Sequence, residues 1–110
     1  MIDFNSLDAV VHGPMRLGVL TALLSHGDQD FSTLKDLLAA TDGALGMHLQ
    51  KLEDVGYIHC RKSFVGRKPK STYAITAPGR KALTRYVETM EAIVALVRSK
   101  ARLPGVQQLD

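Results

Sequence analysis

The sequence is poor in the residues that build several common classes of protein. It holds one cysteine, no tryptophan, three tyrosines and three phenylalanines among 110 residues. A single cysteine cannot form an internal disulfide bond, which excludes a disulfide-stapled scaffold and favours a reducing compartment. No apolar run approaches the ~18 residues of a membrane-spanning helix, and the first residues lack the basic start and apolar stretch of a secretory signal. We therefore expect a cytoplasmic protein.

Catalytic and metal-binding motifs are also missing. The histidines and the cysteine do not show the close spacings of a metal site; they are His12, His26, His48, His59 and Cys60. The sequence contains no phosphate-binding loop, no nucleophile motif and no paired carboxylates. We expect no metal, no cofactor and no enzymatic activity, and we expect Cys60 to be a buried, inert thiol.

Acidic residues are absent from one long stretch of the chain. Residues 61–87 hold eight lysines and arginines and no acid, whereas residues 1–42 hold six aspartates against Arg16 and Lys35. An indifferent solvated surface usually mixes both signs of charge. The acid-free basic stretch therefore favours a polyanionic partner. We expect Arg16, in the acidic half, to form an internal salt bridge.

The composition that remains is that of one soluble globular domain, with 45% apolar and 23% charged residues. Ser6, Ser32 and Thr76 are suitable helix N-caps, and Gly56 is a suitable C-terminal stop. After Gly56 the hydrophobic period changes from helical to strand-like. The sequence predicts helices at 6–11, 14–25, 33–40, 43–55 and 78–102, and Leu103-Pro104-Gly105 ends the last of them. It also predicts a loop at 28–31 and two strands, at 57–64 and 71–75, joined by a turn at 65–70.

This order is that of a winged helix-turn-helix, a mainly α fold with a small β-hairpin (α+β). The predicted domain, 1–110, consists of a core at 6–77 and a long C-terminal helix at 78–102. In helix-turn-helix proteins the second helix of the pair enters the DNA major groove. That helix is predicted here at 43–55, after a tight turn at Thr41-Asp42 that also caps it.

Four motifs in the right order resemble those of MarR/ArsR-type regulators and, within them, the small winged-helix DNA-binding domain family. His48, Leu49, Leu52, Gly56, Tyr57 and Ile58 match the recognition-helix pattern HL-x-x-L-x-x-x-G-[LY]-[IV]. Residues 63–73 resemble the family's wing, residues 75–80 its entry to the C-terminal helix, and residues 12–17 its opening motif. The resemblance covers residues 12 to about 85. It implies a sequence-specific transcription regulator that binds double-stranded DNA, acting as a repressor.

The helical period places the candidate DNA-binding residues on the outward face of the recognition helix. They are Gly43, Ala44, Met47, His48, Gln50 and Lys51, with His48 at the edge. Ala44 and Gly46 stand where many relatives carry Asn and Ser. Gly46 has two interpretations: close approach of the helix backbone to DNA, or a glycine without a role in binding that reflects neutral drift or packing against the preceding helix. The candidate wing residues are Lys62, Arg67, Lys68, Lys70 and Thr72.

The last helix carries an apolar stripe with spacings of three and four residues, typical of a coiled-coil seam. Its residues are Leu83, Tyr86, Val87, Met90, Ile93, Val94 and Val97. The stripe predicts a homodimer that binds a pseudo-palindromic operator. Two alternatives stay open. One is a winged helix used for protein–protein assembly, which the basic wing disfavours. The other is a non-specific nucleic-acid-binding protein, which the low aromatic content disfavours when the target is single-stranded.

Overall fold

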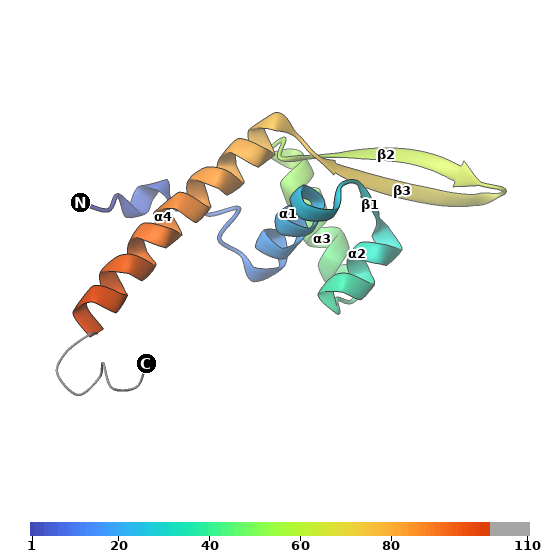
Figure 1. Cartoon of the computed structure of the whole chain (residues 1–110). Helices are drawn as coiled ribbons and strands as arrows, with labels where there is room; N and C mark the ends of the chain where they lie inside the picture. Colours follow the sequence, from blue (N-terminus) through green and yellow to red (C-terminus); the bar gives the residue numbers. More distant parts are fainter. Residues whose placement is uncertain (102–110) are drawn as a thin grey trace.

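Three helices precede a long β-hairpin and a longer helix in the computed structural model, which describes residues 1–101. The helices are α1 (Pro14–His26), α2 (Phe31–Leu38) and α3 (Asp42–Asp54). The hairpin consists of β2 (Ile58–Val65) and β3 (Lys68–Ile75), and α4 (Ala77–Ala101) follows it (Figure 1). This order confirms the winged helix predicted from the sequence. The predicted stop of the last helix, at Leu103–Gly105, lies outside the described residues.

The core forms where α1, α2 and α3 pack under the base of the hairpin. Its buried side chains come from every helix and from both hairpin strands, and they include Val19, Leu20, Leu34, Leu45, Leu49, Leu52, Ile58, Tyr73, Leu83 and Tyr86. Leucines dominate this set because they recur at helical spacing on one face of each helix. The core therefore fixes how α3 and the hairpin stand relative to each other.

The sheet has a third strand that the sequence did not predict. β1 (Gln29–Asp30) pairs with β3, with Gln29 opposite Tyr73 and Asp30 opposite Thr72, so the strand order is β1-β3-β2. The predicted N-cap at Ser32 is wrong: the Asp30 side chain accepts the Thr33 amide at 2.8 Å, and α2 begins at Phe31. One residue thus ends the short strand and begins the helix.

The predicted helix at 6–11 is also wrong. A single 3-10 turn, η1 (Phe4–Ser6), is followed by non-helical turns. The Asp8 carboxylate accepts the amides of Val10 at 2.8 Å and Val11 at 3.3 Å and also accepts the Tyr57 hydroxyl. Such a side chain offers the backbone an alternative to helical hydrogen bonds. Burial raises the pKa of Asp8, but these bonds outweigh it and lower that pKa, while the bond to Asp8 raises the pKa of Tyr57 to about 12.

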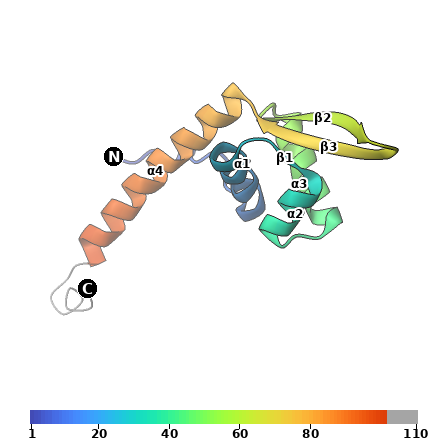
Figure 2. The ribbon, with the colours of Figure 1, turned by 45° about the vertical axis from the view of Figure 1, so that its right-hand side comes forward.

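The long helix α4 starts in the core and then leaves the domain, as both ribbon views show (Figures 1 and 2). Thr76 caps it, as predicted, by accepting the Gly79 amide at 3.1 Å. Gly79 lies against the backbone of Tyr57, so closely that a Cβ on it would stand 2.1 Å from the Tyr57 carbonyl oxygen. This contact joins the start of α4 to the connection between α3 and β2. No helix within residues 1–101 is long and apolar enough to span a membrane.

Candidate nucleic-acid interface

The pair α2–α3 forms the helix-turn-helix. Thr41 caps α3 as predicted, its hydroxyl accepting the Ala44 amide at 3.2 Å. Across the turn, Lys35 of α2 pairs with Asp42 of α3 at 2.9 Å, and this hydrogen bond raises the pKa of Lys35. The Gly56 backbone, at φ +81°, ends α3 in the left-handed region that glycine adopts without strain. Caps at both ends thus define a recognition helix of 13 residues.

The face of α3 turned away from the core carries the predicted contact residues. Leu45, Leu49 and Leu52 are buried, which leaves Gly43, Met47, Gln50 and Lys51 exposed and Ala44 and His48 half-buried. Met47 is 63% exposed, so it is not a core residue. The Gln50 amide already donates to Asp54 at 2.9 Å. A Cβ built on Gly46 would meet no atom within 4 Å outside its own helix backbone and chain neighbours, so packing against the preceding helix does not explain this glycine.

Arg16 does not form the predicted salt bridge. Its guanidinium donates to the carbonyls of Val10 at 2.5 Å and Ala9 at 3.3 Å, and its third nitrogen lies 3.0 Å from Nδ1 of His48. Because a guanidinium can only donate, Nδ1 of His48 is the acceptor in this contact. Backbone carbonyls, which a sequence pattern does not display, take the place of the expected carboxylate. The contact ties the start of α1 to the recognition helix.

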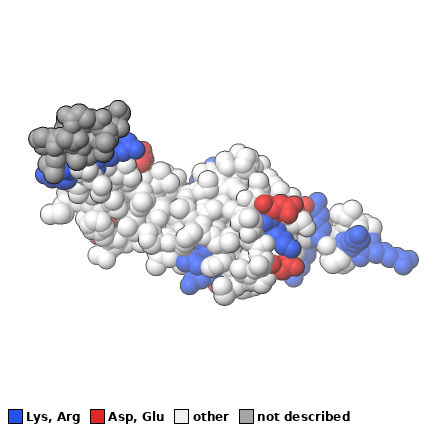
Figure 3. Space-filling model, turned by 90° about the horizontal axis from the view of Figure 1, so that it is seen from below, with Lys and Arg blue, Asp and Glu red and all other residues white. Residues whose placement is uncertain are grey.

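The hairpin is longer and its turn tighter than predicted. The turn consists of Gly66 and Arg67 alone, and Lys68 to Lys70 belong to β3. All residues from 61 to 70 are exposed. Figure 3 shows blue lysine and arginine atoms at the end of the hairpin, with white atoms beside them. We call residues 61–72 the wing.

The basic residues of the wing differ in their partners. Within residues 1–101 no acid pairs with Lys62, Arg67 or Lys68, whereas Lys70 lies 3.6 Å from Asp30. Thr72 is half-buried opposite Asp30. The pairing of Asp30 with Lys70 was not predicted from the sequence. The signal available for Asp30 was that of a helix N-cap, because an aspartate directly before a helical pattern is a recognisable cap. With Arg61, which is also exposed and has no acid partner within residues 1–101, four wing cations are therefore free to meet a polyanion.

The predicted seam on α4 falls into two parts. Leu83 and Tyr86 are buried in the chain's own core, and the Tyr86 hydroxyl lies 2.7 Å from Nδ1 of His12. Further along, the side chains are half-buried or exposed; they are Val87, Met90, Ile93, Val94 and Val97. We call these five residues the α4 stripe. The α4 stripe begins at Val87, one residue after Tyr86, which is the last buried residue of α4.

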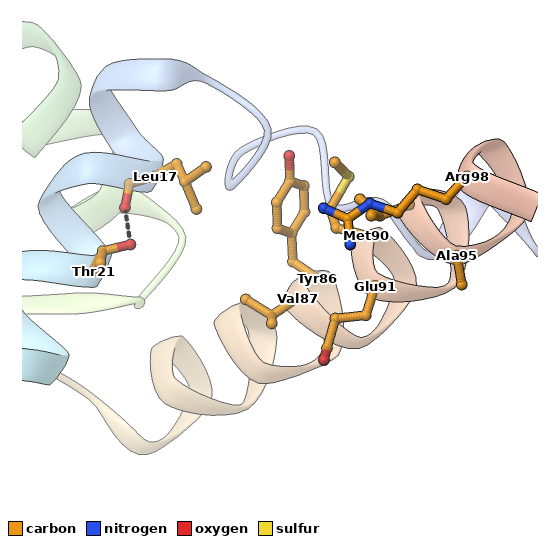
Figure 4. A pocket seen from close by; sticks show the side chains of 9 residues that line it. Leu17, Thr21, Tyr86, Val87, Met90, Glu91, Ala95 and Arg98 are labelled. Carbon is orange, nitrogen blue, oxygen red and sulfur yellow. Dashed lines mark hydrogen bonds between the residues drawn. The ribbon is translucent and has the colours of Figure 1, made fainter. Parts of the chain in front are cut away.

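Beside the α4 stripe lies an apolar groove of about 640 Å³ between α1 and α4. Figure 4 shows Leu17 and Thr21 on the α1 side, Met90 on the α4 side, and the Arg98 side chain reaching back along the helix. Residues 92–97 are an uninterrupted apolar run, and Leu96 within it is exposed on another side of α4. The rest of the chain therefore covers little of this run. An uncovered run of this kind marks a binding surface.

Other chemistry has no cluster of side chains to support it. Within residues 1–101 no three His, Cys, Asp or Glu side chains come together as metal ligands. Cys60 is half-buried against the core, opposite Tyr73 on the neighbouring strand. Burial raises the pKa of Tyr73 to about 12, and the neighbouring Cys60 thiol adds to the shift. This pair fills the base of the hairpin.

Comparison with known proteins identifies the domain. The family model of the winged helix DNA-binding domain matches residues 15–94. An uncharacterized protein of Methanocaldococcus jannaschii is 33% identical over 78 residues, which cover 71% of this chain and 85% of that protein.

Solved structures share the fold. A transcriptional regulator homologue from Pyrococcus horikoshii has a TM-score of 0.78 and 26% identity, covering 84% of this chain and 93% of its own. YusO from Bacillus subtilis has a TM-score of 0.76 and 20% identity, covering 96% and 74%. A structure from Enterococcus faecalis, described as of the MarR family, has a TM-score of 0.74 and 22% identity, covering 90% and 88%. The family match spans most of the described chain, α3 and the wing included, and the chain belongs to the winged helix DNA-binding domain family.

Proposed function

We propose that the protein is a homodimeric transcription regulator of the MarR type that binds specific double-stranded DNA and represses by occupying promoter DNA. The observation that carries the proposal is the pairing of two surfaces on one domain. The outward face of α3 is exposed, and the wing beside it carries four cations with no acid partner within residues 1–101. A helix for the major groove and a basic ribbon for the backbone are what a winged helix needs to hold a duplex.

In this proposal α3 enters the major groove. Ala44 and Met47 contact thymine methyl groups, since both side chains are apolar and Met47 stands in solvent. Gln50 and His48 hydrogen-bond base edges or phosphates, Gln50 after exchanging its bond to Asp54. Lys51 neutralises a phosphate, and Gly43 lets the helix N-terminus approach the backbone.

Gly46 supports close approach of α3 to DNA. A glycine within a helix costs roughly 0.5–1 kcal/mol relative to alanine, and no neighbouring side chain requires it here. We expect Gly46→Ala to raise the free energy of unfolding by that amount and to weaken DNA binding. Urea unfolding and duplex titration of the same preparation measure the two effects. A variant that is more stable and binds DNA unchanged would refute the close approach.

The wing supplies the backbone contacts. Arg67 at the turn enters the minor groove, where a narrow groove attracts arginine, and Lys62 and Lys68 contact phosphates. Lys70 and Thr72 lie nearer the base of the hairpin, and Lys70 must share its charge with Asp30. We therefore rank Lys70 below Arg67 and Lys68 as a contributor to affinity.

Assembly through the α4 stripe completes the site. A second copy would cover the apolar run at 92–97 and the neighbouring groove, and two-fold symmetry would present two copies of α3 to half-sites one helical turn apart. A protein–protein module would not need the unpaired cations of the wing, and a non-specific binder would not need an exposed recognition face. Both alternatives thus leave one surface unexplained.

Selection of duplexes from a random pool tests the proposal as a whole, and the expected result is a pseudo-palindrome that recurs among the selected duplexes.

The dependence of binding on salt concentration tests the wing. Replacing Lys62 and Lys68 by glutamine removes about two phosphate contacts and should flatten the log–log salt slope by about 1.8. Lys100→Gln, at the far end of α4, is the matched control and should leave the slope unchanged. An equal slope in the wing variant means that the wing does not touch DNA.

A further inference from the structure

Two apolar side chains stand in solvent close to the end of the wing. Phe64 is 73% exposed, and the strand register places it directly opposite Pro69 on β3. The next residue, Val65, is 63% exposed and lies opposite Lys68. Phe64 belongs neither to the core nor to the partly buried residues packed against it. Its exposed aromatic ring is therefore available to a partner.

Strand alternation decides which way the two residues face. Ile58 and Tyr73 point into the core, and residues an even number of positions away share their face of the sheet. Phe64 follows Ile58 by six residues and Pro69 precedes Tyr73 by four, with an unbroken register between the strands. Both thus lie on the face that the helices cover lower down, beyond the point where the helices end. Val65 lies on the opposite face.

The charge around this pair restricts the partner. By strand alternation Lys62 shares the face of Phe64, Arg67 lies in the adjoining turn, and Lys68 lies with Val65 on the opposite face; all three are exposed, and no acid within residues 1–101 pairs with them. An apolar surface flanked by cations fits a partner that has an anionic outside and a stacked apolar inside. Duplex DNA has that composition, since phosphates border each groove and base pairs form its floor.

We propose that Phe64 and Pro69 form a wedge that enters the minor groove with the wing and partly unstacks one base-pair step. The inference rests on the proposed function and deepens it. Apolar side chains that insert between base steps from the minor groove kink the duplex toward the major groove and open the minor groove. Opening the groove makes room for a two-stranded ribbon. Pyrimidine–purine steps unstack most easily, so the wedge makes the wing selective for such a step at its contact position.

The test uses the full chain and the duplex found by random selection, labelled for bending by energy transfer between its ends. A 2-aminopurine base is placed in turn at each step of the wing contact. The variants are Phe64→Ala, the conservative Phe64→Leu, and Val65→Ala as the matched control on the opposite face. We expect wild type, Phe64→Leu and Val65→Ala to bend the duplex and to raise 2-aminopurine fluorescence at one step. Phe64→Ala should lose both signals, and its preference for a pyrimidine–purine step over an A-tract should fall by about tenfold.

The salt slope separates the wedge from the proposed function. Phe64→Ala keeps all wing cations, so it should retain the wild-type slope and the wild-type dimer mass. If it retains the bend and the fluorescence as well, the wedge is refuted and DNA binding stands. If its dimer mass falls instead, Phe64 is a protein contact and the wedge is refuted. Wild-type protein that binds no duplex at 0.15 M salt would overturn both the proposed function and the wedge.

Discussion

Aspartate at both Val94 and Val97 is expected to convert the proposed dimer into a 12.0 kDa monomer and to lower affinity for a two-half-site operator by at least about 100-fold. Both side chains belong to the α4 stripe, and Val97 is 59% exposed in the single chain. A buried, unpaired carboxylate at a dimer seam is strongly destabilising. Once the protomers separate, each half-site must be bound independently, and the advantage of two linked contacts is lost.

Sedimentation equilibrium at micromolar concentration measures the mass, and titration of the operator measures affinity. Thr84→Asp is the matched control, because Thr84 is exposed on the same helix and its hydroxyl bonds only to the carbonyl of Arg80. It should leave both mass and affinity unchanged. A double variant that still sediments as a dimer would place the interface elsewhere.

The second large effect is expected at Gly79, where alanine should destabilise the fold by about 3 kcal/mol. The added Cβ would lie 2.1 Å from the carbonyl oxygen of Tyr57 and 2.9 Å from its carbonyl carbon. These are backbone atoms, so no side-chain rotation relieves the clash and α4 must move away from the end of α3. The shift would also strain the contacts of Leu83 and Tyr86 in the core.

Urea unfolding at one fixed protein concentration measures this effect, since the stability of a dimer depends on concentration. Gly46→Ala is the matched comparison, a glycine-to-alanine change in a helix with open space around it, and the two variants should shift the unfolding free energy in opposite directions. An unchanged midpoint for Gly79→Ala would show that the start of α4 is free to move.

Features that depend on residues close together in the sequence, such as helix caps and the buried face of a helix, were predicted from the sequence. Thr41 and Thr76 cap α3 and α4 where the sequence placed them, and Gly56 ends α3. The leucine spacing of α3 also identified its buried face. Caps and helical periods depend on neighbours within a turn or two, so they can be read from a single sequence.

The remainder depends on contacts between distant segments. β1 is two residues long and exists because β3 offers it an edge: Asp30 lies opposite Thr72, 42 positions further along the chain. Arg16 finds carbonyls presented by the irregular turn that Asp8 creates. The buried half of the predicted seam, Leu83 and Tyr86, joins the core because α4 passes over α1 before it leaves the domain. None of these partners shows in a local pattern.

The continuity of α4 has a mechanical consequence. One unbroken helix of 25 residues runs from the core to the stripe, and at 1.5 Å per residue it is about 37 Å long. Such a rod acts as a lever: a tilt of about 5° moves its far end by about 3 Å, close to the 3.4 Å rise of one base pair. Small changes in how two such rods cross would therefore retune the distance between the recognition helices by a whole base-pair step. No hinge would be needed, because the length of a single helix sets how far a given tilt moves its far end.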